Sequence, residues 1–266
     1  MTAFDALVLA GSRSAEDPLA EIRGDTHRSL LPVAGVPMLL RVVRALRAAS
    51  SVERIAVSID EPHALDRAPE LRELAARGAL GVERSLSSPS RSVLHALESR
   101  AFGARVLVTT ADHALLTPEI VDHFTSRADA TAADLAVGVV AESVVRAAHP
   151  TTTRTYLRFR DGGYSGANLF AFRSPAARRA AEFWVRAEAF RKQPWRLARA
   201  FGTRTLLLFA LRRLRFDEAL ARASRAIGCS IRAVALPFAQ AAIDVDRPAD
   251  LELASAILEA RERAQA

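Results

Sequence analysis

Residues 6–13 read Ala-Leu-Val-Leu-Ala-Gly-Ser-Arg, an apolar run that ends in a glycine and an arginine. The run is typical of a buried strand, and Pro37 then opens a helical pattern over residues 38–49. A glycine where a strand meets a loop lets backbone N–H groups turn toward an anion, which nearby arginines can neutralise. The spacing is neither that of a Walker loop nor G-x-G-x-x-G, so a phosphate-binding loop and an ordinary surface loop both stay open.

The alternation of strand and helix continues through the first half of the chain. Strand patterns at 55–59, 81–82, 105–109 and 135–140 alternate with helical patterns at 65–77, 90–100 and 118–127, the last with Thr117 as its cap. We therefore expect an α/β fold of three layers, with a mostly parallel sheet and a ligand site at the carboxyl ends of its strands.

The second half departs from this alternation. Residues 153–159 and 167–172 flank an Asp-Gly-Gly turn and predict antiparallel strands, and residues 175–227 are nearly all helical in pattern. Residues 231–236 and 241–245 return to strands, and a last helix begins at Pro248. Because the sequence has no internal repeat and no low-complexity linker, we predict a single domain over 1–266 with a helical subdomain inserted at about 175–227.

Composition narrows the class of protein. Half of the 266 residues are apolar and a quarter are charged, which excludes wholesale disorder and a collagen-like chain. Cys229 is the single cysteine, which excludes an internal disulfide and a thiolate metal cluster within one chain. The longest apolar stretch, 205–211, is far shorter than the roughly 20 residues that span a bilayer. Since no secretion signal is evident either, we expect a cytoplasmic protein.

The positive charge is concentrated in one segment. The chain carries a formal net charge of +7, yet residues 186–215 alone hold nine arginines and lysines against one acid, Glu188. That segment contributes +8 and the remainder −1, so a nucleic-acid partner is disfavoured. Its arginines interleave with aromatic residues at helical spacing. A local aromatic core with solvated arginines is slightly favoured, a surface for anionic membrane comes second, and RNA binding comes third.

The first loop and the residues after it resemble the opening of MobA-like nucleotidyltransferases. The stretch Leu-Leu-Pro-Val-Ala-Gly-Val-Pro-Met-Leu at 30–39 carries the resemblance. Relatives include molybdenum cofactor guanylyltransferase and methylerythritol phosphate cytidylyltransferase, and the resemblance implies a Rossmann-like fold of GT-A type. It also implies nucleotide binding by the loop, with Arg28 at the place of the family's lysine. The loop residues that it implicates are Ala10, Gly11, Ser12 and Arg13, of which Arg13 would contact the phosphates.

A second segment, residues 88–93, resembles the part of cytidylyltransferase relatives that contacts the nucleotide. There, backbone groups and a serine hydroxyl make the contact, which implicates Ser90 and Ser92 and gives CTP a slight preference over GTP. A plain helix N-cap, for which Ser88 or Ser90 would suffice, is the alternative that the residues alone favour.

Aspartates predict a magnesium site. Asp112 follows the strand at 105–109 and should project from its carboxyl end, where it can hold Mg²⁺ or cap the following turn. Asp244 and Asp246 alternate along a predicted strand and therefore share a face. The segment resembles the family's Asp-x-Asp-x-Pro-x-Asp-Leu ending, although Ala114 replaces the proline of the family's Asp-x-Pro after Asp112. We expect Asp112 and Asp244 to hold the metal, with Asp246 as an alternate ligand or its supporting partner.

The acceptor is expected at a third segment. Residues 164–170 match the family's Gly-x-Asn loop, which implies that Gly166 and Asn168 hold the acceptor substrate. Arg154 and Tyr156 could add a phosphate clamp and a wall, although an arginine there is more commonly exposed to solvent.

Together these features predict a Mg²⁺-dependent nucleotidyltransferase with an NTP and a small phosphorylated acceptor as its ligands. A phosphate monoester of a sugar, polyol or lipid head group would attack the α-phosphorus and release pyrophosphate. Two alternatives stay open: a GT-A-type glycosyltransferase that uses a nucleotide sugar, and a non-catalytic relative that binds a membrane or partner through its basic helices. The sequence does not predict the oligomeric state.

Overall fold

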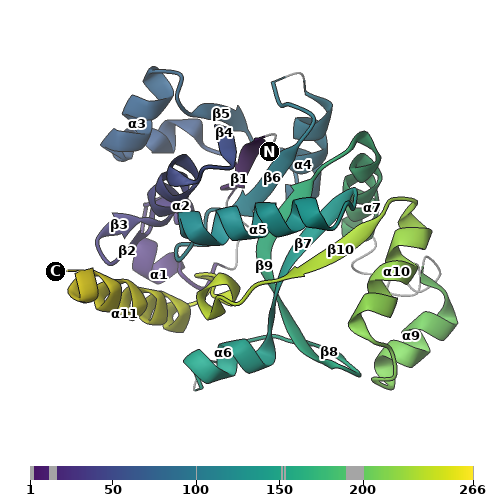
Figure 1. The fold of residues 1–266 in the computed structure, drawn as a ribbon. Coiled ribbons are helices and arrows are strands. Elements are labelled where there is room, and N and C mark those ends of the chain that lie inside the picture. The colour runs from purple at the N-terminus through teal and green to yellow at the C-terminus, as the bar shows by residue number, and fades with distance from the viewer. Residues whose placement is uncertain are drawn as a thin grey trace.

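A twisted sheet forms the centre of the molecule (Figure 1). The computed structural model describes residues 3–11, 17–99, 101–150, 152, 154–189 and 201–265. Within these ranges the strands are β1 Phe4–Leu9, β2 Pro32–Val33, β3 Val36–Pro37, β4 Val52–Ile59, β5 Gly81–Arg84, β6 Val106–Thr110, β7 Leu135–Ala141, β8 Leu157–Phe159, β9 Gly162–Phe172 and β10 Ile231–Ala235.

The sheet is mostly parallel, as the alternation of strand and helix predicts. Its strand order is β10-β7-β9-β6-β1-β4-β5, with β8 paired to β9 off this path. β1 runs parallel to β4 and β6, and β10 runs parallel to β7. The long strand β9 is antiparallel to both β6 and β7, and it lies between them in the middle of the sheet. This insertion brings a segment from the second half of the chain into contact with the central strands.

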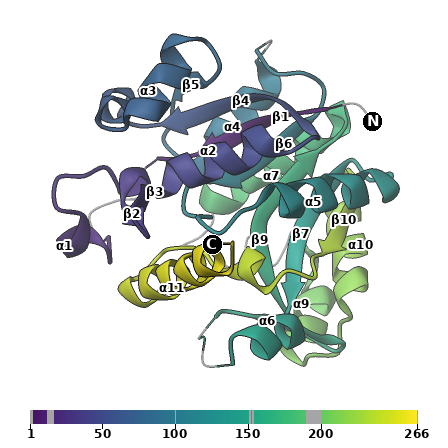
Figure 2. The same ribbon diagram turned by 60° about the vertical axis from the view of Figure 1, so that its left-hand side comes forward.

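Helices cover both faces of the sheet (Figure 2). The α-helices are α1 Ala20–Arg23, α2 Met38–Ala48, α3 Pro69–Ala76, α4 Pro89–Glu98, α5 Pro118–Ala130, α6 Glu142–Ala148, α7 Arg178–Ala189, α9 Thr203–Ala210, α10 Phe216–Ile227 and α11 Pro248–Gln265. Short 3₁₀ turns are η1 Arg28–Leu30, η2 Pro62–Arg67, η3 Pro175–Ala177 and η4 Ala239–Ala242.

The alternating side chains of the central strands explain the three layers. Ala6 and Val8 of β1 pack into a core cluster with α2 and α5, whereas Leu7 packs into a second cluster with α4 and α7. Successive residues of a strand point to opposite faces, so a continuously apolar strand must be covered on both. Such burial excludes water from both sides of β1 and holds its carboxyl end in place.

Local capping fixes where two helices begin. Ser88 accepts a hydrogen bond from the Arg91 N–H at the start of α4, and Thr117 accepts one from the Ile120 N–H at the start of α5. Each cap precedes a proline, whose fixed φ suits the first helical position. The Thr117 cap agrees with the sequence analysis, as does the α5 start at Pro118.

A third core cluster lies beside the carboxyl ends of the central strands. It joins Leu31 and Met38 near the first loop, Leu115 after β6, and Ile243 and Val245 before α11. These segments are far apart in the sequence, and their apolar side chains are almost completely buried. The cluster therefore holds the loops that carry Arg28, Asp112 and Asp244 against one another.

Several predicted elements differ from the observed ones. Residues 241–245 are not a strand: the 3₁₀ turn η4 ends at Ala242, and the Val245 N–H bonds to the Asp112 carbonyl rather than to a sheet neighbour. The helix expected at 65–77 is split at Ala68, ahead of Pro69, into η2 and α3. Of the described residues 154–159 only 157–159 form a strand, and α6 was not predicted at all.

The described part of the basic segment consists of the end of α7, the helix α9 and a turn at 211–215. α7 and α10 pack against the sheet in the second core cluster, where the Trp184 ring of α7 lies 6.1 Å from the Phe170 ring of β9. Residues 190–200, which include Arg191, Lys192, Arg196 and Arg199, lie outside the described ranges. No described helix is both long enough and apolar enough to cross a membrane.

Candidate functional site

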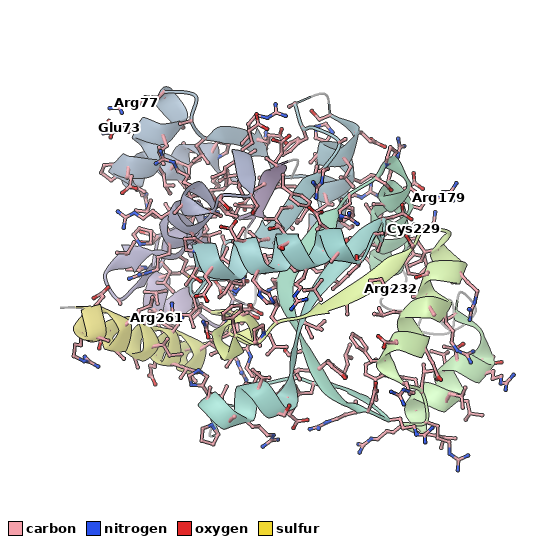
Figure 3. All side chains as sticks on the ribbon, in the orientation of Figure 1. Glu73, Arg77, Arg179, Cys229, Arg232 and Arg261 are labelled. Atoms are coloured by element: carbon pink, nitrogen blue, oxygen red, sulfur yellow. The ribbon has the colours of Figure 1, made fainter. Side chains whose placement is uncertain are left out.

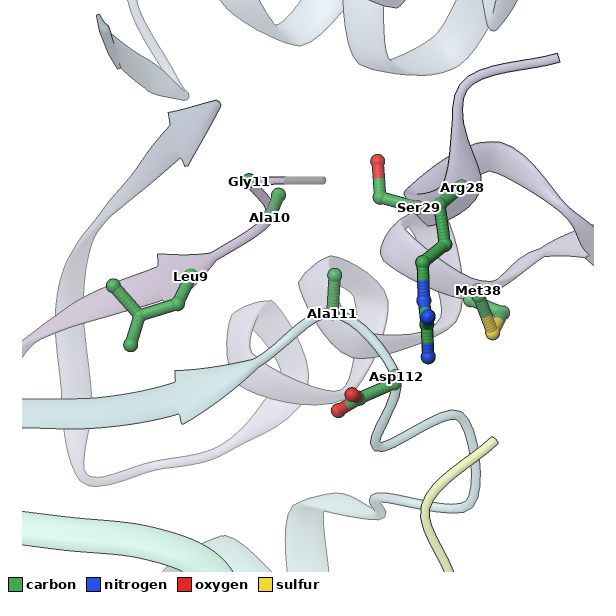
Figure 4. Close-up of a pocket in the computed structure, with 8 residues that line it drawn as sticks. All are labelled: Leu9, Ala10, Gly11, Arg28, Ser29, Met38, Ala111 and Asp112. Atoms are coloured by element: carbon green, nitrogen blue, oxygen red, sulfur yellow. The ribbon is translucent and has the colours of Figure 1, made fainter. Parts of the chain in front are cut away.

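A pocket opens where β1 and β6 end (Figure 4). It is lined by Leu9, Ala10, Gly11, Arg28, Ser29, Met38, Ala111 and Asp112. The structure thus brings together four residues that the sequence implicates in the site, namely Ala10, Gly11, Arg28 and Asp112. Two others, Ser12 and Arg13, lie outside the described residues.

Gly11 closes one side of this pocket. A Cβ atom placed on it would come within 3.2 Å of the Ser85 hydroxyl, which follows β5. The preceding Ala10 N–H donates to the Ser58 carbonyl of β4 at 2.8 Å. The loop therefore leaves the sheet at a position where a larger side chain would crowd its neighbour, which explains the glycine.

Arg28 is held between two acids. Its Nη1 donates to Asp17 Oδ1 at 3.0 Å, and its Nη2 donates to Asp246 Oδ1 at 2.7 Å and to the Val245 carbonyl at 3.3 Å. The guanidinium descends from η1 toward the Asp112 side of the pocket (Figure 4). Asp246, predicted as a possible metal ligand, is thus engaged with Arg28, and its side chain is 51% exposed.

Asp17 is a residue of the site that no sequence motif indicates. Its carboxylate also accepts from Arg23 Nε at 2.8 Å and from the Leu19 N–H at 3.1 Å. Burial opposes its charge, but these hydrogen bonds and the two arginines hold the pKa of Asp17 below its usual value. Asp17 lies in the loop after Gly11, where no spacing rule indicates which of several polar residues turns inward.

Asp112 and Asp244 are close neighbours. The Val245 N–H donates to the Asp112 carbonyl at 3.0 Å, which ties the two segments together through the backbone. The Thr110 hydroxyl donates to Asp112 Oδ1. Burial raises the pKa of Asp244 well above its usual range, and the charge of Asp112 raises it further, against the lowering effect of Arg154. The two carboxylates therefore repel each other inside the protein.

The Asp112–Asp244 pair fits a divalent cation. Asp244 Oδ1 is buried and has no hydrogen-bond partner among the described residues, which is costly for a carboxylate oxygen. No group of three metal-ligating side chains occurs in the described ranges. That is compatible with Mg²⁺, which keeps several waters and is usually bound by one or two carboxylates together with substrate phosphates.

Arg154 is buried rather than exposed to solvent. It donates to Asp250 Oδ1 at 3.0 Å and to Asp244 Oδ2 at 3.4 Å, and its side chain is only 9% exposed. Asp250 also accepts from the Arg247 N–H at 3.0 Å, in the first turn of α11. Asp244 and Asp250 both lie in the segment that resembles the family's ending. Arg154 therefore links the chain just before β8 to that segment.

Asn168 has an unusual backbone for a strand residue. Its φ is 46°, in the left-handed region, where the β7–β9 register shifts between Val137 and Val139. Asparagine tolerates this conformation better than most residues, and bulges of this kind redirect side chains beside functional sites. Gly166 next to it is exposed, with open space where a Cβ would stand.

Tyr156 and His113 are buried polar groups near Arg154. The Tyr156 hydroxyl and both ring nitrogens of His113 find no hydrogen-bond partner in the described part of the chain. Burial, aided by the Arg154 charge, lowers the pKa of His113 to about 4, so the ring is neutral at pH 7. Burial also raises the pKa of Tyr156.

Ser90 and Ser92 lie in the first turns of α4, and both hydroxyls are engaged within the protein. Ser90 Oγ donates to Glu188 Oε2 of α7 at 2.5 Å, and Ser92 Oγ accepts from the Leu86 N–H at 2.9 Å. The Ser92 hydroxyl is only an acceptor in this bond, so its proton and the backbone of the first turn of α4 are the groups that this segment offers to a ligand.

A further network beside the pocket was not anticipated. His27 Nδ1 accepts from the Ser29 N–H at 3.3 Å and faces the Ser29 hydroxyl at 2.8 Å, while its Nε2 lies 2.9 Å from Asp60 Oδ1. Because Nδ1 accepts, the proton is on Nε2 and points to Asp60. The network holds His27 and Ser29 in place, and with them Arg28, which lies between these two residues.

A family model matches most of the chain. The model for the MobA-like NTP transferase domain matches residues 6–227. No curated protein matches the chain.

Solved structures resemble it along their whole length. A hypothetical transferase from Thermus thermophilus has a TM-score of 0.77 and 34% sequence identity, and the match covers 94% of this chain and 100% of that one. CMP:2-keto-3-deoxy-manno-octonic acid synthetase complexed with CTP has a TM-score of 0.58 and 16% identity, over 98% of this chain and 100% of the other. 4-Diphosphocytidyl-2C-methyl-D-erythritol synthase has a TM-score of 0.60 and 14% identity, over 97% and 99%.

Proposed function

The chain belongs to the MobA-like NTP transferase family and is a nucleotidyltransferase, and from this premise we propose the reaction that it catalyses. An NTP is joined to a phosphate monoester of a sugar, polyol or lipid head group. The observation that carries the proposal is the single pocket wall shared by Gly11, Arg28 and Asp112, with Asp244 next to Asp112. A positively charged side chain beside a pair of acids is what a triphosphate and its metal require.

The chemistry needs no nucleophile from the protein. A phosphate oxygen of the acceptor forms a bond to the α-phosphorus, the bond from that phosphorus to the bridging oxygen breaks, and pyrophosphate leaves. The chain's own contribution is to align the reactants and to stabilise the charge that develops on the triphosphate. We assign the charge stabilisation to Arg28, with Arg13 as its partner from the first loop.

Asp112 and Asp244 would hold Mg²⁺, with Asp246 close by on Arg28. The orphaned, buried oxygen of Asp244 supports this assignment. When bound, the cation would neutralise phosphate charge and help to orient the α-phosphate. The family as a whole typically uses a divalent metal, and magnesium is the choice that suits an all-oxygen donor set.

The acceptor would lie against β9. Asn168 both donates and accepts hydrogen bonds, which suits a hydroxylated phosphate ester, and the open space at Gly166 leaves room for it. Arg154, buried between Asp244 and Asp250, would position the Asp244 loop rather than clamp a phosphate directly. The Tyr156 ring would form an apolar wall beside Arg154.

CTP is the favoured nucleotide, and GTP is the next candidate. The segment that carries Ser90 and Ser92 supports this order, since it resembles that of cytidylyltransferases. Two structural neighbours at low identity are named for cytidylyl compounds or were solved with CTP, and they add support. In this proposal the protein is cytoplasmic and contacts an anionic membrane peripherally.

The test is pyrophosphate release measured across the four NTPs with a panel of sugar, polyol and lipid-head-group phosphates, with and without EDTA. We expect turnover with CTP and one acceptor class, abolished by EDTA and restored by Mg²⁺. Release of a nucleoside diphosphate from a nucleotide sugar, with no NTP present and no pyrophosphate formed, would assign the protein to glycosyl transfer instead.

A further inference from the structure

One end of the molecule combines exposed leucines with exposed arginines. Leu157 on β8 is 57% exposed, Leu207 on α9 is 60% exposed, and Leu211, the C-cap of α9, is 55% exposed. Arg204 and Leu207 are three residues apart on one face of α9, and Leu211 follows four residues later at the end of that face. We call the set of Leu157, Arg204, Leu207, Leu211, Arg212 and Arg213 the β8–α9 surface.

Aromatic contacts make this surface one rigid unit. The Phe159 ring of β8 lies 5.3 Å from that of Phe209 on α9 and 5.0 Å from that of Phe216 on α10. Tyr164 of β9 stacks on Phe216 at 4.4 Å. The Arg160 N–H donates to the Leu214 carbonyl at 2.9 Å. The exposed leucines therefore belong to elements that a cluster of aromatic side chains, the aromatic base, packs together.

The arginines of this surface form no ion pair within the described part of the chain. Arg204, Arg212 and Arg213 are exposed, as is the adjacent Arg215, and none of the four forms an ion pair with a described residue. Two acids at the start of α10 bond to backbone groups instead: Glu218 accepts from the Arg215 N–H, and Asp161 accepts from the Phe216 N–H. The surface consequently presents exposed arginines beside apolar side chains, without an ion-paired acid among the described residues.

We propose that the β8–α9 surface docks the protein on an anionic lipid bilayer. Leucines exposed by more than half are unfavourable in water, whereas a bilayer interface accepts aliphatic side chains and attracts arginines at the same depth. A nucleic acid would use the arginines but has no place for the leucines. Because no described helix can span a membrane, the contact is at the membrane surface.

The surface is connected to the acceptor side of the sheet. Tyr164 belongs to its aromatic base, and Asn168 follows four residues later on β9, a distance of about 13 Å along a strand. The docking itself does not depend on the transfer reaction. If the proposed function holds, docking brings membrane-borne head-group phosphates within reach of Asn168.

Vesicle cosedimentation tests the docking, with phosphatidylcholine vesicles alone and mixed with phosphatidylglycerol. The wild-type chain should bind the mixed vesicles and not the neutral ones, and added salt should weaken the binding. Reversal of charge in Arg204→Glu, Arg212→Glu and Arg213→Glu together should lower the partition coefficient by about 100-fold or more, since each basic residue contributes about fivefold.

A matched control has the same change of net charge at the other end of the molecule. The triple variant Arg47→Glu, Arg72→Glu and Arg77→Glu alters exposed residues of α2, of α3 and of the C-cap that follows α3. Arg77, the C-cap residue, lies at the corner remote from α9 (Figures 1 and 3). This control should still bind. Equal loss of binding in both triple variants would mean that net charge alone drives adsorption, and would overturn the proposal.

The leucines separate lipid from other partners. Leu207→Gln with Leu211→Gln keeps the charge and should reduce vesicle binding about tenfold or more. Unchanged vesicle binding in this variant would overturn the proposal, as would equal binding of the wild type to neutral and anionic vesicles. Tight binding of single-stranded RNA that the leucine variant leaves intact, without vesicle binding, would assign the surface to nucleic acid. Pyrophosphate release on a soluble acceptor, measured in parallel, distinguishes failure of docking from failure of the proposed reaction.

Discussion

Arginines at the candidate site and arginines on the β8–α9 surface have opposite environments. Arg28 and Arg154 are buried or half-buried, and each is held by two aspartates. Arg212 and Arg213 are exposed and form no ion pair with a described residue. The same side chain thus serves a preorganised site in one region and an open surface in the other. In a chain with a single lysine, residue type alone tells little about role, and the neighbouring acids decide it.

The largest expected effect is on the acids of the pocket. Asp112→Asn and Asp244→Asn should each lower kcat about 1000-fold or more, because either change removes one of the two carboxylates assigned to the cation. The melting temperature of Asp112→Asn should stay the same or rise, since the mutual repulsion of the two acids disappears, whereas Asp244→Asn also removes a negative partner of Arg154. Pyrophosphate release and thermal melting measure the two effects. A well-folded Asp112→Asn protein with near wild-type turnover would remove the metal assignment.

The buried pairing of Arg154 should appear in stability. Asp250→Ala leaves a 9% exposed guanidinium without its closer partner and should lower the free energy of unfolding by about 3 kcal/mol. Arg247→Ala removes an exposed partner of the same carboxylate and should cost less than about 1 kcal/mol. Urea denaturation compares them. Equal losses in the two variants would show that burial does not distinguish these arginines.

Arg28 sharpens the comparison by charge type. Arg28→Ala should lower kcat/KM for the NTP about 50-fold, whereas Arg28→Lys, which keeps the cation, should lose about fivefold. Arg23→Ala is the control, because Arg23 shares Asp17 but does not line the pocket. Steady-state kinetics at subsaturating NTP measure the effect. If Arg28→Ala behaves like wild type, the loop alignment with the family is wrong.

The smallest effect belongs to the exposed arginines. Arg212→Glu with Arg213→Glu should change the free energy of unfolding by less than about 0.5 kcal/mol, as expected for surface residues without partners. Turnover on a soluble acceptor should not change. If the free energy of unfolding fell by several kcal/mol, these arginines would contribute to the packing of the molecule, and the two regions would not differ in this respect.

Local sequence patterns predicted much of the fold. Apolar runs marked β1, β6 and β7, and the Thr117-Pro118 pair marked a helix start, because burial and capping leave traces within a few residues. The central antiparallel place of β9 leaves no such trace, since strand order depends on partners far away in the sequence. The strand predicted at 241–245 was wrong, because alternating apolar and acidic residues also suit an extended segment outside the sheet. Here the segment follows η4, and its Val245 N–H bonds to the Asp112 carbonyl in the turn after β6.

The candidate site shows the same division. Asp112 and Asp244 were predicted to meet, and they do, because strand ends and the family resemblance both indicate the same edge of the sheet. The acids that hold Arg28 and Arg154 were not foreseen. Asp246 lies 218 residues from Arg28 and Asp250 lies 96 residues from Arg154, and only the assembled core brings such residues together.

Arg28 has an internal competitor for every anion that approaches it. Asp17 and Asp246 already occupy both arms of its guanidinium, so a ligand must exchange places with a carboxylate and gains only the difference between the two interactions. A singly charged anion gains little from such an exchange, whereas a triphosphate offers several charges at once and meets the cation and the metal-binding acids together. The two aspartates thereby select for ligands with several negative charges, and this selection does not depend on contacts with the base or the acceptor.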